Sequence, residues 1–176
     1  EALEEALAAG INLIDTSTNY SDGRSERLVG RVISKLVRKG TLKREEVVVV
    51  SKVGYLQGQN LQNAQSRENP HEDVVEYGDD LWHCIHPSFI REQISNSIAR
   101  LGLETIDICL LHNPEYFLLN SHRVGGGTRP QLEAEMRRRI KEAFVQMEKE
   151  CQAKRVGFYG VSSNTFVDKE KNFTTL

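Results

Sequence analysis

The amino-acid sequence predicts an α/β protein whose parallel strands belong to a (β/α)8 barrel, and two observations support this fold class. Short apolar segments alternate with amphipathic helices, which is the order that produces a parallel sheet covered by helices. Polar side chains follow the apolar segments, and in a barrel the carboxyl ends of the strands meet around one mouth. A doubly wound sheet is disfavoured because the glycine run Gly125 to Gly127 follows no predicted strand and fits no dinucleotide-binding pattern.

The first part of the chain predicts a helix, a strand, a second helix and a second strand. Residues 1–9 are rich in Ala, Leu and Glu and end at a glycine, as a helix does, and the apolar residues 11–14 predict a short strand. Residues 28–37 repeat apolar side chains at helical spacing and predict the second helix. Val47 to Val50 are all β-branched and predict a strand that is buried on both faces.

The second part of the chain repeats this order. Apolar side chains recur at helical spacing from about Ser88 to Leu101, and Ile106 to Leu111 predict the third strand. A long helix from Leu132 to Cys151 then precedes a fourth strand at Val156 to Val161. Residues 54–87 are polar without clear periodicity, which is long for a loop in a compact domain, and we interpret them as an insertion over one face.

These segments predict a single domain over residues 1–176, and an incomplete one. A complete barrel has eight strands and about 250 residues, whereas this sequence predicts half as many strands. We therefore expect the sequence to be a fragment of the barrel. The open strand edges of such a fragment would favour self-association.

Composition and charge exclude several classes of protein. The 176 residues carry a net charge of -2, and no stripe of Lys and Arg predicts nucleic-acid binding. No apolar run is long enough to cross a membrane and no signal sequence is recognisable, so we expect a cytoplasmic protein without a membrane partner. Cys84, Cys109 and Cys151 are widely spaced, which predicts neither a disulfide framework nor a zinc cluster.

Polar side chains stand at the ends of all the predicted strands. Asp15 and Lys52 follow the first two strands, and His112 and Ser162 follow the last two. Each has an ordinary explanation if taken singly: Asp15 could simply cap a helix, and Lys52 could be a solvated strand end. Their occurrence at successive strand ends favours one shared active site at the mouth of a barrel.

The sequences around these residues resemble the aldo-keto reductase family. Asp15-Thr16-Ser17-Thr18-Asn19-Tyr20, followed by Gly23 and Ser25-Glu26, is similar to the strand-to-helix signature of that family. The segments Ser51-Lys52, Leu111-His112-Asn113-Pro114 and Gly160-Val161-Ser162-Ser163 stand where the family has its other functional residues. The resemblance implies a barrel of the aldo-keto reductase type, NADPH as the cofactor, and a catalytic tetrad of Asp15, Tyr20, Lys52 and His112.

The resemblance also implies a place for the nicotinamide ring. Ser162 and Ser163 stand where members of the family bind the carboxamide group. The family often has Asn at the second position, whereas this chain has Ser163 there and Asn164 one residue later. The amide partner therefore stays open between them, and Ser162, Ser163 and Asn164 are all candidate cofactor-binding residues.

Carbonyl reduction by hydride transfer needs the same residue types. Negative charge builds on the carbonyl oxygen as hydride arrives at the carbon, and a proton must reach that oxygen. Tyr20 would supply the proton, and the Lys52 ammonium would stabilise the phenolate that remains. Asp15 would hold Lys52 in place, and His112 would donate a hydrogen bond to the oxygen. The expected substrate is a small aldehyde, ketone or sugar carbonyl.

Two other functions stay open. The chain could be a non-catalytic regulatory or binding subunit that keeps the aldo-keto reductase architecture, as relatives resembling channel β-subunits do. It could instead be a metal-dependent hydrolase that uses His83, His86 and His112. No second pair of Cys or His lies at zinc-finger spacing, so we expect no metal.

Overall fold

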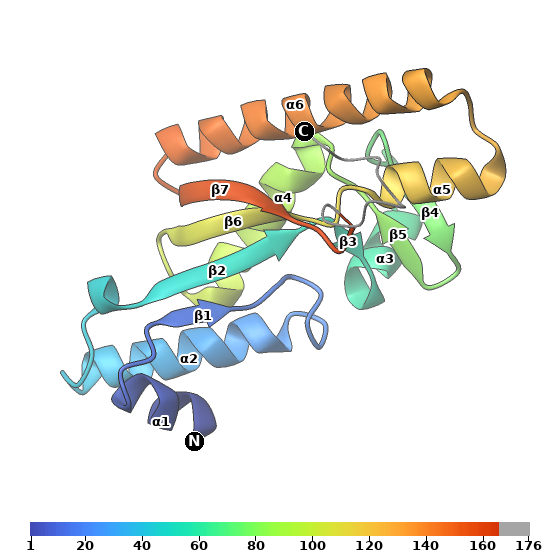
Figure 1. Ribbon diagram of the computed structural model, residues 1–176. Coiled ribbons are helices and arrows are strands. Elements are labelled where there is room, and N and C mark those ends of the chain that lie inside the picture. Colours follow the sequence, from blue (N-terminus) through green and yellow to red (C-terminus); the bar gives the residue numbers. More distant parts are fainter. Residues whose placement is uncertain (166–176) are drawn as a thin grey trace.

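The computed structural model describes residues 1–165, and its main element is a sheet of parallel strands with the order β1-β2-β6-β7 (Figure 1). The strands are β1 (Leu13–Asp15), β2 (Val48–Val53), β6 (Ile106–His112) and β7 (Val156–Ser162). Neighbours in the sheet are therefore successive parallel strands of the chain. A (β/α)8 barrel has this order, whereas the strand order of a doubly wound sheet reverses at one point.

Helices connect these strands and cover the outside of the sheet. They are α1 (Ala2–Ala8), α2 (Arg24–Arg38), α4 (Pro87–Leu101) and α6 (Arg129–Gln152). Helix α4 packs between α2 and α6, and α6 packs on β7. Figure 1 shows α2 beside β1 and α6 beside β7, at the two sides of the sheet. No helix in residues 1–165 is long and apolar enough to cross a membrane.

The structure confirms the predicted fold class, a mixed α/β fold with a parallel sheet, and each predicted helix and strand is present. Strand β2 continues past the valines to Val53, so Lys52 lies within the strand rather than after it. Residues 1–165 do not form a closed barrel. In the described sheet, β1 pairs only with β2, and β7 pairs only with β6.

Helix α2 packs closely against α4 because Gly30 has no side chain. A Cβ atom at Gly30 would lie 2.0 Å from the carbonyl oxygen of Leu101, the last residue of α4. The close contact buries Glu26 in the first turn of α2. The Glu26 carboxylate accepts hydrogen bonds from the Ser51 hydroxyl at 2.6 Å and from Arg100 Nε at 2.5 Å. This buried ion pair links α2, β2 and α4 next to Lys52.

Residues 54–87 fold into a small antiparallel sheet rather than an irregular loop. The segment contains β3 (Tyr55–Leu56), α3 (Gly58–Gln65), β4 (Val75–Gly78) and β5 (Leu81–His83), with the strand order β3-β5-β4. Buried apolar side chains of this segment and of the first turn of α4 form a second core cluster: Leu56, Leu61, Cys84 and Phe89. Its strands have two to four residues, which is too short for an alternating pattern to appear in the sequence. Figure 1 shows this sheet beyond the ends toward which the parallel strands point.

Two further elements have no counterpart in the sequence-based prediction. Helix α5 (Tyr116–Val124) directly follows the loop after β6, and its buried residues, Leu118 and Ser121, are too few to show helical periodicity. A single 3-10 turn, η1 (Arg44–Glu46), precedes β2. Gly125 ends α5 in the left-handed conformation, with a φ of 72°, so the glycine run turns the chain from α5 toward α6.

Candidate active site

The polar residues predicted to share a site lie at the same end of the parallel sheet. Asp15, His112 and Ser162 are the last residues of β1, β6 and β7, and Lys52 is one residue from the end of β2. The register of the sheet pairs Lys52 with Leu110, and His112 with Ser162. Parallel pairing therefore brings these side chains to one edge, as the sequence predicts.

Lys52 is the centre of a buried hydrogen-bond cluster. Only 4% of the residue is exposed, and its ammonium forms an ion pair with the Asp15 carboxylate. The ammonium also donates to the carbonyl oxygen of Thr16 at 3.0 Å and to the Tyr20 hydroxyl at 3.3 Å. A buried ammonium is stable only with such partners. Its three hydrogens thus have three acceptors, and one of these is the phenol oxygen.

A tight turn after β1 brings Tyr20 to Lys52. Ser21 and Asp22 both have positive φ, at 49° and 56°, and Gly23, the residue before α2, is in the same left-handed region. The turn places the Tyr20 ring so that the Lys52 ammonium is 4.8 Å from its centre. Tyr20 stays 39% exposed, although its hydroxyl contacts the buried Lys52 ammonium.

His112 lies beside Tyr20 and is largely buried. The two ring centres are 6.0 Å apart, in an edge-to-face arrangement. Burial and the Lys52 ammonium lower the pKa of His112 to about 4, so the imidazole is neutral near pH 7. Its Nδ1 atom lies 3.2 Å from the hydroxyl of Ser17. The four residues of the predicted tetrad are thus together in space, and their chemical roles are taken up under Proposed function.

Two residues of the segment 54–87 contact the backbone and the ring of His112. The buried His83 ring donates from Nε2 to the carbonyl oxygen of His112 at 2.8 Å, and burial lowers the pKa of His83 to about 4. The Tyr55 ring lies edge-on to the His112 ring, with 4.6 Å between centres. The Tyr55 hydroxyl accepts a hydrogen bond from the Asn113 amide at 2.6 Å. Neither Tyr55 nor His83 could be placed here from the sequence, because a separate sheet positions them.

The candidate cofactor residues are the last residue of β7, Ser162, and the two residues that follow it, Ser163 and Asn164. The Ser162 carbonyl oxygen accepts from the backbone N–H of Asn113 at 2.7 Å. The Ser163 hydroxyl and the backbone N–H of Asn164 donate to one oxygen of Glu115, at 2.8 Å and 3.0 Å. Glu115 is only 2% exposed and was not predicted as a site residue. The Glu115 carboxylate therefore links the loop after β6 to the loop after β7 through these hydrogen bonds.

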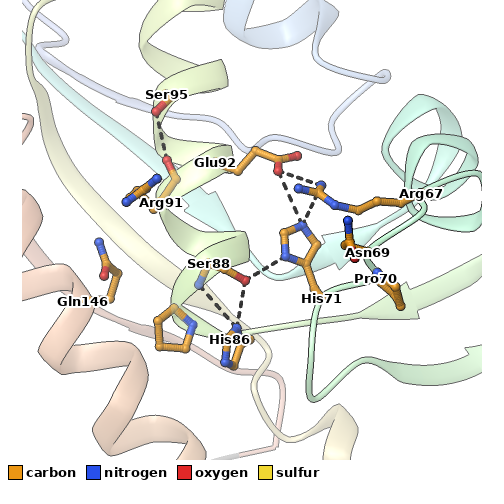
Figure 2. Close-up of a pocket in the computed structure, with 11 residues that line it drawn as sticks. Arg67, Asn69, Pro70, His71, His86, Ser88, Arg91, Glu92, Ser95 and Gln146 are labelled. Atoms are coloured by element: carbon orange, nitrogen blue, oxygen red, sulfur yellow. Dashed lines mark hydrogen bonds and ion pairs between the residues drawn. The ribbon is translucent and has the colours of Figure 1, made fainter.

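The histidines that the sequence offers as metal ligands do not converge. His83 contacts the backbone of His112, whereas His86 lies at the start of α4, in a pocket of about 680 Å³ (Figure 2). There His86 and His71 both contact the Ser88 hydroxyl, at 2.9 Å and 2.8 Å. No group of three His, Cys, Asp or Glu side chains in residues 1–165 is arranged to hold a metal ion.

The fold and these contacts define a class of protein: an α/β chain of the (β/α)8 type with a Lys, Tyr, Asp and His cluster at its strand ends. The profile of the aldo/keto reductase family matches residues 1–172. The chain belongs to the aldo/keto reductase family, whose members are oxidoreductases.

Individual relatives agree with this membership. The NADH-specific methylglyoxal reductase of Escherichia coli is 34% identical over 115 residues, which are 64% of this chain and 30% of that protein. An aldo-keto reductase from Bacillus halodurans in its holo form has a TM-score of 0.61 at 23% identity, over 92% of this chain and 40% of that one. A Bombyx mori aldo-keto reductase in complex with NADP has a TM-score of 0.54 at 22% identity, over 91% and 38% of the two chains. The two structures support the fold alone, and this chain spans less than half the length of all three proteins.

Proposed function

We propose that the protein is a cytoplasmic oxidoreductase that reduces an aldehyde, ketone or sugar carbonyl with NADPH or NADH, and that Tyr20 is its proton donor. One observation carries this proposal: the buried Lys52 ammonium binds both the Asp15 carboxylate and the Tyr20 hydroxyl. A phenol held against a buried cation is suited to give up a proton, because the cation stabilises the phenolate.

Each residue of the cluster has a task in this reaction. When bound, the nicotinamide would supply a hydride to the carbonyl carbon. Tyr20 passes its proton to the carbonyl oxygen, and a general acid in place contributes roughly 10²–10⁴-fold to a rate. Lys52 stabilises the resulting phenolate, and Asp15 holds Lys52 through their ion pair. His112 lies beside Tyr20 and orients the substrate through a hydrogen bond from its ring.

Buried polar atoms support an amide-bearing cofactor at this end of the sheet. Thr18 Oγ1, Asn113 Oδ1 and Glu115 Oε2 are buried and have no hydrogen-bond partner among the described residues. A buried polar atom without a partner costs about 1–3 kcal/mol, so a ligand that pairs with it gains affinity. A carboxamide carries N–H donors and a carbonyl acceptor. We propose that Ser162, Ser163 and Asn164, together with Glu115, hold the nicotinamide carboxamide.

The relatives do not share one nicotinamide cofactor. One relative is named as NADH-specific, and another is solved in complex with NADP. NADPH follows from the family resemblance of the sequence, so we propose NADPH as the cofactor and test NADH beside it.

The test compares binding and turnover in the wild type and in Tyr20→Phe. We expect saturable binding of NADPH, followed by nicotinamide fluorescence, in both proteins, and loss of carbonyl reduction in Tyr20→Phe alone. Tyr159→Phe is the matched control, because its hydroxyl contacts Glu148 at 2.5 Å on the outer helix α6. Folded protein that binds neither NADPH nor NADH would contradict the proposal and favour a regulatory or binding subunit.

We also propose that the chain self-associates through its outermost strands. Leu13 on β1 is 53% exposed and Phe158 on β7 is 73% exposed, and each of these strands pairs on one side within the described sheet. Such edges and apolar side chains favour association. Sedimentation velocity over a range of concentrations should show species larger than a monomer, and a strictly monomeric chain would contradict this.

A further inference from the structure

A groove of about 880 Å³ lies between α2 and the C-terminal end of α4. No Asp or Glu lines this groove, whereas six cationic side chains do: Arg24, Arg27, Arg31, Lys35, Arg38 and Arg100. Lys35 pairs with Glu4 at 2.7 Å, and Arg100 pairs with the buried Glu26. The other four are exposed arginines that form no ion pair within residues 1–165. The groove therefore has a positive charge that the described part of the chain does not neutralise.

The helical period gathers these cations on the outer face of α2. They follow one another at intervals of three or four residues from Arg24 to Arg38, so the sequence itself shows no basic run. An α-helix turns once in about 3.6 residues with a pitch of about 5.4 Å, so this spacing gives one cation per turn. At about 1.5 Å per residue, the row is about 21 Å long. A ligand that matches it is elongated and carries several anionic groups.

The row of cations does not stabilise α2 by itself. Arg31 lies four residues from both Arg27 and Lys35, and like charges at this spacing destabilise a helix. The other long exposed helix, α6, differs in this respect. Its arginines pair with carboxylates three or four residues away, in contacts that join Arg129, Arg137, Arg138 and Arg139 to Glu133 and Glu135. An anionic partner would relieve the repulsion along α2 as the carboxylates do along α6.

The rest of the groove is lined by small residues and by the end of α4. Gly30, Ser34 and Ala99 lie there, together with Gly102, which ends α4 in the left-handed conformation with a φ of 62°. A polypeptide backbone can approach such small residues closely. The last carbonyl oxygens of a helix have no partner within the helix, so this end offers hydrogen-bond acceptors. A ligand that fits both sides has anionic groups for α2 and N–H donors for α4.

A peptide with acidic side chains has both features. Carboxylates form bidentate pairs with the guanidinium group of Arg, and the peptide backbone supplies N–H donors. In an extended peptide, alternate side chains point to one face about 6.6 Å apart, which is near the spacing of about 5.4 Å between turns of α2. Single-stranded nucleic acid is bound by stacking on aromatic side chains, and no aromatic residue lines the groove. Polyphosphate has no N–H donor for the end of α4.

We propose that the groove between α2 and α4 is a docking site for an extended acidic segment of a partner protein, with Asp or Glu at alternate positions. The exposed arginines of α2 bind the carboxylates, and the end of α4 accepts hydrogen bonds from the backbone of the segment. Docking needs neither the cofactor nor a carbonyl substrate, so this inference is independent of the proposed reaction.

Fluorescence anisotropy with labelled peptides tests the proposal on the whole chain. The probe alternates Glu and Ser over about eight residues, which extend about 26 Å. We expect saturable binding at about 50 mM salt that weakens steeply toward about 0.5 M, because salt screens exposed charges. A peptide that alternates Lys and Ser should not bind. An oligonucleotide of thymidines and a polyphosphate of similar charge should bind at least about tenfold more weakly than the acidic peptide.

Arg31→Glu separates binding from folding. The new carboxylate would lie four residues from both Arg27 and Lys35, so we expect thermal stability at least equal to that of the wild type. Affinity for the acidic peptide should fall by about tenfold or more, because an attraction becomes a repulsion. Arg137→Glu makes the same change of charge at an exposed arginine of α6 and should bind the peptide as the wild type does.

Several outcomes would overturn the inference. One is the absence of saturable binding of the acidic peptide by the folded wild type, and another is unchanged affinity in Arg31→Glu. An equal loss of affinity in Arg137→Glu would show that the peptide responds to overall charge and not to the groove. Tighter binding of the oligonucleotide or of polyphosphate than of the peptide would assign the groove to a phosphate polymer instead.

Discussion

The Lys52 ammonium lies 3.3 Å from the Tyr20 hydroxyl, and the same ammonium lowers the pKa of His112. One buried cation therefore acts on two neighbouring groups of the candidate site. Lys52→Met keeps the length and apolar stem of the side chain and removes the charge. We expect carbonyl reduction to fall by about 10²-fold or more, because the phenolate loses its stabilising cation.

The same variant has a second readout that needs no cofactor. Without the Lys52 charge, the pKa of His112 should rise above its wild-type value of about 4 toward the usual value of 6.5. An NMR titration of His112 measures this change directly. A pKa that stays at its wild-type value in folded Lys52→Met protein would show that Lys52 does not act on the ring.

The two buried histidines predict a stability that falls in mild acid. Burial holds the pKa of His83 and of His112 at about 4, whereas both have the ordinary value of 6.5 when the chain unfolds. Between these values the unfolded state binds protons that the folded state does not, so folding free energy is lost as pH falls from 6.5 to about 4. Each histidine contributes up to about 3 kcal/mol to this loss.

Urea denaturation at pH 7 and at pH 5 measures this effect. His83→Gln cannot take up a proton, so its stability should depend less on pH than that of the wild type, even if it is lower at pH 7. His122→Gln is the control, because His122 lies on α5, outside the candidate site. Equal pH dependence in the wild type and in His83→Gln would contradict the prediction.

The site residues at the strand ends could be predicted from the sequence, because their positions depend only on local patterns. Asp15, Lys52 and His112 each follow or end an apolar run, and parallel pairing alone brings them together. Tyr20 lies in a polar turn, and its role could be predicted only through the family resemblance. The turn itself depends on the positive φ values of Ser21 and Asp22, which the sequence does not reveal.

Other site residues could not be predicted from the chain alone. Tyr55 and His83 reach His112 from short strands whose pairing is antiparallel and local to residues 54–87. Glu115 is buried only because the loops after β6 and β7 meet. The sequence offered His83 as a possible metal ligand although no metal was expected, and in the structure its ring supports the backbone carbonyl of His112.

Removal of the buried Glu26 carboxylate is expected to destabilise the fold strongly. It accepts from Ser51 and from Arg100, and it is fully buried. Glu26→Ala leaves the Arg100 guanidinium without its partner, and breaking a buried ion pair in this way costs about 3–5 kcal/mol. Urea denaturation of Glu26→Ala beside Glu104→Ala, which removes an exposed carboxylate, measures the difference. A loss of the same size in both variants would show that the ion pair is unimportant.

Gly30 offers a test in which two effects have opposite signs. Alanine is favoured over glycine inside a helix by about 1 kcal/mol, so Gly30→Ala would stabilise an isolated α2. In the folded chain the new Cβ would lie 2.0 Å from the Leu101 carbonyl oxygen, and backbone atoms of α2 and α4 would have to move apart. Overpacking of this kind costs about 1–3 kcal/mol, which exceeds the gain in helix propensity, so Gly30→Ala should be destabilised.

Ser34→Ala, on the exposed side of the same helix, is the control. It should be stabilised by about a few tenths of a kcal/mol, because alanine has a higher helix propensity than serine. Thermal and urea unfolding of both variants measure the signs, and a stabilised Gly30→Ala would show that α2 and α4 are not in close contact.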